Sequence, residues 1–301
     1  MEGVRYLVGM GTRDMHVRVA RRLWLLLDAI RFEHSVFALP FAYVGMLLAA
    51  RGLPQWWQVI WITAAMVCAR TMAMAANRLI DRHLDRMNPR TAQRHLPTGR
   101  LSAREMALLG VAGLVGFVYS AAQLNDLCLQ LTPLAIVVLI GYSYTKRFTW
   151  ASHFVLGFAD AMAPAGGWLA VRGQFDTPML VLTAAVGLWI AGFDVIYAIQ
   201  DIEFDRQMKL HSVPVRFGVP AALHLSSLTH LLTLLLLVSV GEMLSLGLLY
   251  WVGLAVAAGL LAYEHAIIGP RDLTRLGVAF FNVNGYIAII VFVFTLGALY
   301  Q

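Results

Sequence analysis

Apolar stretches long enough to cross a lipid bilayer dominate this chain and constrain its fold more than any other feature. Nine are present, at 35–51, 55–80, 104–123, 126–145, 152–171, 179–200, 219–240, 244–264 and 278–300. Most approach the roughly 20 residues that a helix needs to span the hydrocarbon core. Hydrophobic residues make up 59% of the chain and charged residues only 13%. Since a backbone in lipid must satisfy its own hydrogen bonds, we expect one all-α, multi-pass membrane domain over 1–301.

Basic residues are distributed unevenly among the connecting segments. Of the 23 Lys and Arg residues, all but three fall in the N-terminal segment or in loops after alternate stretches. The exceptions are Arg51 and Arg172 on the other side and Arg70 within a stretch. The positive-inside rule then puts the N-terminus in the cytoplasm and the C-terminus outside the plasma membrane. The net charge of +6 reflects this topology and does not indicate nucleic-acid binding. We expect a bilayer around the protein, no nucleic acid and no obligate protein partner.

The segment 18–32 mixes arginines with Leu and Trp. This pattern predicts an amphipathic helix on the membrane surface.

Two acidic segments follow a common pattern. The first places Asn77, Asp81 and Asp85 four residues apart, and the second does the same with Tyr197 and two further aspartates, Asp201 and Asp205. On a helix, positions i, i+4 and i+8 stay within about 80° of one another. The spacing therefore predicts a polar stripe at the cytoplasmic end of each of two helices.

Carboxylates at this spacing repel each other, and the C-terminal end of a helix disfavours negative charge. Nearby arginines could neutralise them as local ion pairs: Arg78, Arg82, Arg86 and Arg206. The matched depth and spacing of the two segments favour a different interpretation, which is Mg²⁺ binding. This ion commonly takes one or two carboxylates together with substrate phosphates, and it would neutralise a leaving diphosphate. Basic residues that would complete such a clamp are Arg90, Arg94, Lys146, Arg147 and Lys209.

Other polar residues within the apolar stretches are open to two interpretations. Asp194 lies two helical turns before Asp201, and Arg70 stands in the same relation to Asn77. Ionisable residues at this depth are functional by default, although each could instead pair with a neighbouring helix. The histidines lack the close helical spacing of a zinc site, so we interpret those near helix ends, including His153, as polar rim residues.

These features resemble the UbiA superfamily of intramembrane prenyltransferases over nearly the whole chain. The two acidic segments match the family's order and spacing, and YSYTKRFTW at 142–150 is similar to its Tyr-x-x-x-Lys-Arg-x-Thr pattern. RHLPTGRLS at 94–102 is similar to its Arg-Pro-x-Pro-x-Gly pattern, from which His95 and Leu96 depart.

The resemblance implies nine transmembrane helices around a central cavity, with cytoplasmic cap loops at 81–103 and 201–218. It also implies Mg²⁺-dependent transfer of a polyprenyl group from its diphosphate, with four catalytic aspartates. Its metal site would comprise Asn77, Asp81, Asp85, Asp201 and Asp205.

Within the family, RFEHSVFALPFA at 31–42 and LHSVP at 210–214 are similar to 4-hydroxybenzoate polyprenyltransferases of quinone biosynthesis. They are also similar to enzymes that prenylate a dihydroxynaphthoate on a route to menaquinone. Both acceptors are carboxylated phenols. Arg31 or Arg147 could bind the carboxylate as a bidentate fork, and the resemblance places Asp194 and Tyr197 at the acceptor. We expect 4-hydroxybenzoate, with dihydroxynaphthoate as the alternative.

A cation-coupled transporter is the competing hypothesis from another class, since intramembrane aspartates can serve such coupling. Transporters usually place these sites near the bilayer midplane between broken helices. Here the aspartates lie at helix ends beside Arg-rich loops. That position favours a diphosphate at headgroup depth.

Overall fold

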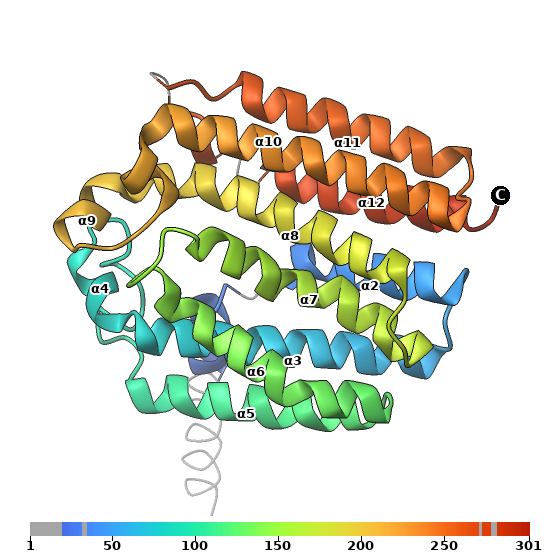
Figure 1. The fold of residues 1–301 in the computed structure, drawn as a ribbon. Coiled ribbons are helices and arrows are strands. Elements are labelled where there is room, and N and C mark those ends of the chain that lie inside the picture. The colour runs from blue at the N-terminus through green and yellow to red at the C-terminus, as the bar shows by residue number, and fades with distance from the viewer. Residues whose placement is uncertain (1–19, 32–34, 271–272, 278–281) are drawn as a thin grey trace, which may run out of the picture.

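The protein is a bundle of helices, described by a computed structural model over residues 20–31, 35–270, 273–277 and 282–301 (Figure 1). The longer helices are α2 (Ser35–Ala50), α3 (Trp56–Ile80), α5 (Ala103–Ala122), α6 (Asp126–Thr145), α7 (Ser152–Arg172), α8 (Thr177–Tyr197), α10 (Val213–Leu244), α11 (Leu248–Ala266) and α12 (Asn284–Ala298). The short elements are α4 (Arg82–Met87), the 3₁₀ turn η2 (Ala198–Asp201) and α9 (Ile202–Gln207).

The predicted all-helical membrane architecture is confirmed. Among the described residues, seven helices are long and apolar enough to cross a bilayer, and α2 and α12 are shorter apolar helices. The prediction of nine spans agrees with the structure only if these two also cross the bilayer. Residues 278–281, at the start of the last predicted stretch, lie outside the described residues.

One end of the bundle, called the capped end below, carries the short helices α4 and α9, and the C-terminus lies at the opposite end (Figure 1). The segments 81–103 and 201–218, expected as cap loops, contain these helices, and α10 already begins at Val213. Within α10 the backbone kinks at Gly218, whose φ of 82° favours glycine. The predicted stretch 219–240 therefore starts at the kink, and the five residues before it belong to the capped end.

Local sequence signals explain where several helices begin. Ser102 and Glu105 form a reciprocal capping box at the start of α5, in which each side chain accepts a hydrogen bond from the other residue's backbone N–H. At the start of α6 the Asn125 side chain accepts from the Cys128 backbone N–H. Ser212 caps α10 in the same way through the Val215 N–H.

Helix α7 lies between α2 and α8 and approaches both closely through glycines. A Cβ placed on Gly157 would come within 2.2 Å of the Gly187 carbonyl oxygen on α8. A Cβ on Gly167 would come within 2.1 Å of the Ala42 carbonyl oxygen on α2. Small residues at such contacts let helix backbones pack tightly where lipid supplies no hydrophobic drive for helix association.

A helical segment at 20–29 packs against the capped end, within the range 18–32 predicted to be an amphipathic surface helix. Residues 18, 19 and 32 lie outside the described residues. Arg22 forms an ion pair with Glu105, with 2.6 Å between Nε and Oε1, and Ile30 packs against Leu101 and Met106. The opposite side exposes Trp24. The position of this helical segment on the membrane surface stays a prediction.

Candidate active site at the capped end of the bundle

A cavity of about 150 Å³ opens between the two acidic segments. Eight charged side chains line it, four acidic and four basic: Asp81, Asp85, Asp201 and Asp205 with Arg90, Arg94, Lys146 and Arg147. All eight come from residues that the sequence predicts for the metal and diphosphate sites. The two acidic segments therefore share one pocket.

Asp81 lies where α3 gives way to α4. The backbone leaves regular helical geometry at this residue, but the Asp81 N–H still bonds to the Asn77 carbonyl and the Asp85 N–H to the Asp81 carbonyl. Each predicted stripe therefore begins on a long helix and continues into the short elements that follow it, while the aspartates of both stripes line one pocket. Arg147 donates to Asp81 Oδ1 at 2.8 Å and Asn77 donates to Oδ2 at 2.9 Å. Burial raises the pKa of Asp81, and Arg147 offsets part of this effect.

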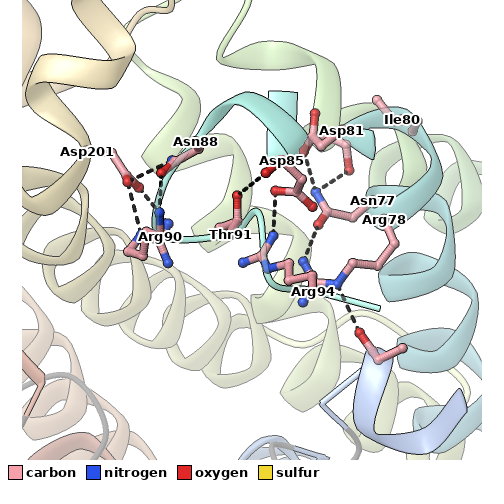
Figure 2. A network of polar contacts seen from close by, with 12 residues as sticks. Asn77, Arg78, Ile80, Asp81, Asp85, Asn88, Arg90, Thr91, Arg94 and Asp201 are labelled. Carbon is pink, nitrogen blue, oxygen red and sulfur yellow. Dashed lines mark hydrogen bonds and ion pairs between the residues drawn. The ribbon is translucent and has the colours of Figure 1, made fainter. Parts of the chain in front are cut away.

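Asp85, on α4, is held by the loop that follows it (Figure 2). Arg94 donates to Asp85 Oδ1 at 2.7 Å, and the Thr91 hydroxyl donates to the Asp85 backbone carbonyl at 3.0 Å. The second carboxylate oxygen, Oδ2, is buried and has no hydrogen-bond partner among the described residues. A buried carboxylate oxygen left in this state is available to a ligand that enters the pocket.

Asp201 links the two halves of the pocket (Figure 2). Arg90 binds its carboxylate as a fork, with Nε to Oδ1 at 3.0 Å and Nη2 to Oδ2 at 2.7 Å. Arg90 also donates to the Tyr197 hydroxyl at 3.0 Å, and Asn88 donates to Asp201 Oδ1 at 3.1 Å. Burial disfavours the charged guanidinium, but the bonds to Asp201 outweigh this and raise the pKa of Arg90.

Asp205, on α9, is almost fully buried and pairs with Lys146 at 2.8 Å. The Lys146 backbone carbonyl also accepts from the His211 N–H at 2.7 Å. Lys146 thus fixes α9 to the end of α6 through its side chain, and the chain after α9 through its backbone carbonyl.

Each aspartate has a basic partner on another element or in a following loop. Arg78 and Arg206 do not form the local ion pairs with the aspartates that the sequence left open as an alternative. Arg78 donates to the Ala29 carbonyl, and Arg206 donates to Glu203. Long-range pairing of this kind builds a shared site, whereas local pairs would only stabilise separate helix ends.

Some predicted site residues lie outside the pocket lining. Lys209 is exposed, with a positive φ of 56°, and does not line the cavity. Arg31 is exposed next to residues outside the described range. Asn77 lies behind Asp81 and donates to it and to the Ser143 hydroxyl.

Deeper in the bundle, Asp194 is bound by His153. The Asp194 Oδ2 and His153 Nδ1 atoms are 2.6 Å apart, and His153 Nε2 accepts from the Val213 backbone N–H at 3.3 Å. Because a backbone donor occupies Nε2, the ring proton must be on Nδ1 and is donated to Asp194. His153 is only 2% exposed, so the prediction that it is a rim residue is wrong.

Several residues at the site escaped sequence reasoning. Asn88, Thr91 and Ser143 contact the aspartates or their partners. Asn88 and Thr91 flank Pro89 and Arg90 in the loop after Asp85, so a polar turn beside a predicted metal ligand is the signal that could have found them. His153 has no comparable signal, since the contact spans 41 positions.

The oxygen-rich donor set fits Mg²⁺. In the described part of the chain, no three His, Cys, Asp or Glu side chains converge closely enough to hold an ion by themselves. Mg²⁺ does not need such a cage, because it keeps water and phosphate oxygens in its octahedral shell. The buried, unpaired Asp85 Oδ2 is one carboxylate oxygen ready for this role.

Comparison with known proteins identifies close relatives. The pattern of the UbiA prenyltransferase family matches residues 38–286. A 4-hydroxybenzoate octaprenyltransferase of Vibrio cholerae serotype O1 is 33% identical over 265 residues, covering 88% of this chain and 93% of that protein. A protein of the same name from Aliivibrio fischeri strain MJ11 is 30% identical over 294 residues, covering 95% and 100%.

Solved structures share the fold. A UbiA homolog from Aeropyrum pernix K1, in its apo form, is 37% identical with a TM-score of 0.80, covering 86% of this chain and 95% of that one. A UbiA homolog from Archaeoglobus fulgidus, bound to DMAPP and Mg²⁺, is 21% identical with a TM-score of 0.66, covering 88% and 98%.

Proposed function

The chain belongs to the UbiA prenyltransferase family, and from this premise we propose that it transfers a polyprenyl group from a polyprenyl diphosphate to a hydroxylated aromatic acid. Membership of this family identifies the chain as a prenyltransferase. The competing hypothesis of a cation-coupled transporter therefore has no remaining support. Three features are our proposal: the acceptor, the dependence on Mg²⁺ and the roles of individual residues.

The observation that carries the proposal is the single pocket lined by four aspartates and four cations. When the prenyl group is transferred, the diphosphate leaves as a highly charged anion, so its departure needs positive charge close to the phosphate oxygens. Mg²⁺ supplies that charge when it is bound with the diphosphate. Asp81, Asp85, Asp201 and Asp205, with Asn77 behind Asp81, would hold the ion.

The basic residues of the pocket would bind the diphosphate directly. Arg90, Arg94, Lys146 and Arg147 each pair with an aspartate at 2.7–2.8 Å. With the carboxylates holding Mg²⁺, these cations would be free to donate to phosphate oxygens. Lys209, exposed at the end of α9, would meet the diphosphate at the entrance.

The acceptor would lie on the bundle side of this pocket. Asp194 has one carboxylate oxygen bonded to His153, and the other can accept a hydrogen bond from a ring hydroxyl. Electron donation from that hydroxyl activates the neighbouring ring carbon for attack on the prenyl group. Tyr197 lies one turn further along α8, with its hydroxyl on Arg90.

Arg31 remains our candidate for the acceptor's carboxylate. Arg147, the other candidate, already binds Asp81, the Ile80 carbonyl and the Ser143 carbonyl. We therefore assign Arg147 to the diphosphate.

The identity of the acceptor has two candidates. The relatives named as 4-hydroxybenzoate octaprenyltransferases support 4-hydroxybenzoate. A dihydroxynaphthoate is the second candidate, because the segments 31–42 and 210–214 are also similar to enzymes that use this acceptor. Either reaction would take place in the plasma membrane with the capped end in the cytoplasm, where a soluble aromatic acid can reach the pocket.

The test is turnover by the purified protein with Mg²⁺, a labelled prenyl diphosphate and a panel of aromatic acids. Removing magnesium with EDTA should abolish turnover, and adding it back should restore it. Asp81→Ala and Asp201→Ala should each lower kcat by about 100-fold or more, since each change would remove a ligand of the metal that stabilises the leaving diphosphate.

Glu203→Ala is the matched control. Glu203 lies on α9 between Asp201 and Asp205, but its side chain is 79% exposed and pairs with its neighbour Arg206. This variant should keep wild-type turnover. Full activity of the aspartate variants, or undiminished turnover in EDTA, would contradict the assignment of the metal site.

A further inference from the structure

Residues 20–30, a short helix and the residue after it, have one face against the bundle and one face exposed. The inner face packs on the ends of α3 and α5 through apolar side chains: Leu25, Leu26, Ala29 and Ile30. The outer face consists of apolar side chains that are 42–62% exposed: Leu23, Trp24 and Leu27. Since a helix turns about 100° per residue, these three lie within roughly 100° of one another. Large apolar side chains gathered on one exposed face indicate a contact surface.

This outer face continues the lipid-facing surface of α5. Along α5, exposed apolar side chains recur every three or four residues: Leu108, Val111, Val115 and Tyr119. Glu105 lies one turn before Leu108 and binds Arg22 of the segment, with 2.6 Å between Nε and Oε1. Helix α5 is long and apolar enough to cross a bilayer, so the segment lies where its apolar stretch ends. At that depth, acyl chains meet headgroups, and this boundary takes up the apolar face of an amphipathic helix.

The segment 20–30 also holds the loop 88–102, which connects α4 to α5. Asp28 Oδ2 lies 2.5 Å from His95 Nε2, and Arg22 Nη1 donates to the Arg100 carbonyl at 2.9 Å. Leu96 packs into the same apolar cluster as the inner face of the segment. The loop is therefore held at two points, one near its middle and one near its end.

His95 and Leu96 are the two residues at which this loop departs from the Arg-Pro-x-Pro-x-Gly pattern of the family. His95 stands where that pattern has proline, and proline has no side-chain donor or acceptor. Both departures contact the segment, His95 through Asp28 and Leu96 through the apolar cluster. The contact between loop and segment is therefore a property of this chain that the family's pattern does not supply.

The same loop supplies two of the four cations of the aspartate pocket. Arg90 and Arg94 each bind a pocket aspartate at 2.7 Å. Arg94 directly precedes His95, and the Thr98 hydroxyl lies 2.9 Å from the Arg94 carbonyl and 3.3 Å from the His95 carbonyl. A displacement of His95 would therefore move the backbone of Arg94 as well.

The polar contacts of the segment are too weak to hold it alone. The side chains of the pair between Arg22 and Glu105 are 52% and 27% exposed, and such pairs contribute little in water. The bond between Asp28 and His95 also involves a part-exposed carboxylate. Burial of the outer face in lipid would supply the further stabilisation, because surface binding of a helix grows with the apolar area that it buries.

We propose that the outer face of residues 20–30 binds the bilayer surface at the capped end, and that the bound segment fixes the loop 88–102 through Asp28 and His95. Both are positioning residues, since they reach a ligand only through Arg90 and Arg94. This coupling rests on the proposed function, in which the two arginines bind the diphosphate. The partner is the lipid surface, and Arg21, exposed on the same segment, would meet headgroup phosphates.

The first experiment measures what the outer face contacts. In a variant with Cys68 and Cys128 replaced by Ala, Leu23→Cys carries a fluorescent label, and the protein is placed in nanodiscs of phosphatidylcholine and phosphatidylglycerol. A quencher attached close to the lipid headgroup should quench the label strongly, and aqueous iodide should quench it weakly. The control is the same label at Arg86→Cys, an exposed position on α4, where iodide should be the stronger quencher.

Two results would overturn the lipid contact. Strong quenching by iodide at position 23 would show that the outer face lies in water. Protection from both quenchers would show that a protein surface covers it, either from this chain or from a second copy.

The second experiment measures the coupling as the Kd for a prenyl diphosphate, determined by direct binding with Mg²⁺ in the same nanodiscs. Asp28→Ala and His95→Ala should each raise this Kd about 3- to 10-fold, the range of one net hydrogen bond. The double variant should raise it no further, because both changes remove the same bond. Asp28→Asn keeps an acceptor oxygen for His95 and should recover most of the loss. Trp24→Glu, which places a charge on the outer face, should raise the Kd as well.

Asp126→Ala, which changes an exposed carboxylate at the start of α6, is the control and should keep the wild-type Kd. Unchanged Kd values in Asp28→Ala and His95→Ala, or additive losses in the double variant, would contradict the coupling and leave the proposed function standing. A wild type that binds prenyl diphosphate but prenylates no aromatic acid would contradict the proposed function and leave the coupling standing.

Discussion

The contact between His153 and Asp194 shows how a single buried residue can orient a carboxylate. His153 Nδ1 donates to Asp194, and its other nitrogen is occupied by the Val213 N–H at the start of α10. The imidazole therefore fixes the direction of the Asp194 carboxylate and ties it to the capped end. His153 is a positioning residue under this proposal, because it reaches the acceptor only through Asp194.

Substitution of His153 gives a prediction at this scale. His153→Leu removes the donor to Asp194 and should raise the acceptor KM about 10- to 100-fold, the range of a hydrogen bond to a charged group. His153→Asn keeps an N–H donor close to the position of Nδ1 and should recover most of the loss. Steady-state kinetics with each substrate varied in turn will show this, and the KM for prenyl diphosphate should not move.

His83→Ala, which changes an exposed histidine on α4, is the control for this series. An equal loss in the Leu and Asn variants would mean that His153 serves packing alone.

The four aspartates could be predicted from the sequence because their spacing repeats in two places and places them on one face of a helix. Their partners could not be predicted in the same way. Arg90 reaches Asp201 across 111 positions and Arg147 reaches Asp81 across 66. Such pairs depend on which helices lie side by side, and local spacing carries no information about that. Arg90 and Arg147 were expected at the diphosphate, but their pairing was not.

Helix α7 approaches α2 and α8 closely because glycines, which lack a side chain, lie at both contacts. Gly157→Ala should destabilise the protein by about 1–3 kcal/mol, because the new Cβ meets backbone on α8 that cannot move aside. Gly166, on the same helix, has nothing within 4 Å of its would-be Cβ. Gly166→Ala should leave stability unchanged or raise it slightly, since alanine favours a helix.

Thermal unfolding in detergent measures both variants. A lower Tm for Gly157→Ala alone is the expected result. Equal midpoints for the two variants would show that the contact between α7 and α8 adjusts without cost.

The length of the apolar stretches predicts where most helices lie, because a segment that spans a bilayer can satisfy its backbone hydrogen bonds in few ways other than as a helix. It did not predict where they bend or end. Helix α3 stops at Ile80, just before Asp81, and α10 starts at Val213 and kinks at Gly218. Both features lie at the capped end, where polar contacts compete with helical geometry and hydrophobicity no longer sets the boundary.

At the scale of the whole molecule, the distribution of arginine predicts that the capped end faces the cytoplasm. A variant with Cys68 and Cys128 replaced by Ala allows this to be measured with one cysteine at a time. Arg86→Cys places the thiol at the capped end, and Gln174→Cys places it between α7 and α8; both positions are exposed.

A membrane-impermeant thiol reagent added to intact cells should label Gln174→Cys and not Arg86→Cys. After permeabilisation it should label both. The reverse pattern would place the pocket on the outside and contradict the predicted orientation.

The pairing of every aspartate with a cation in the pocket has a consequence for how ligands enter. A metal ion alone would have to separate carboxylates from cations that then have no partner, and a diphosphate alone would leave carboxylates with none. Together the two ligands would satisfy both sets, the carboxylates through the metal and the cations through the phosphates. Each ligand must then strengthen the binding of the other by the same factor, as thermodynamic linkage requires. Under the proposed function, the resting ion pairs would therefore make the binding of magnesium and of prenyl diphosphate cooperative, so that the pocket takes up the two ligands together.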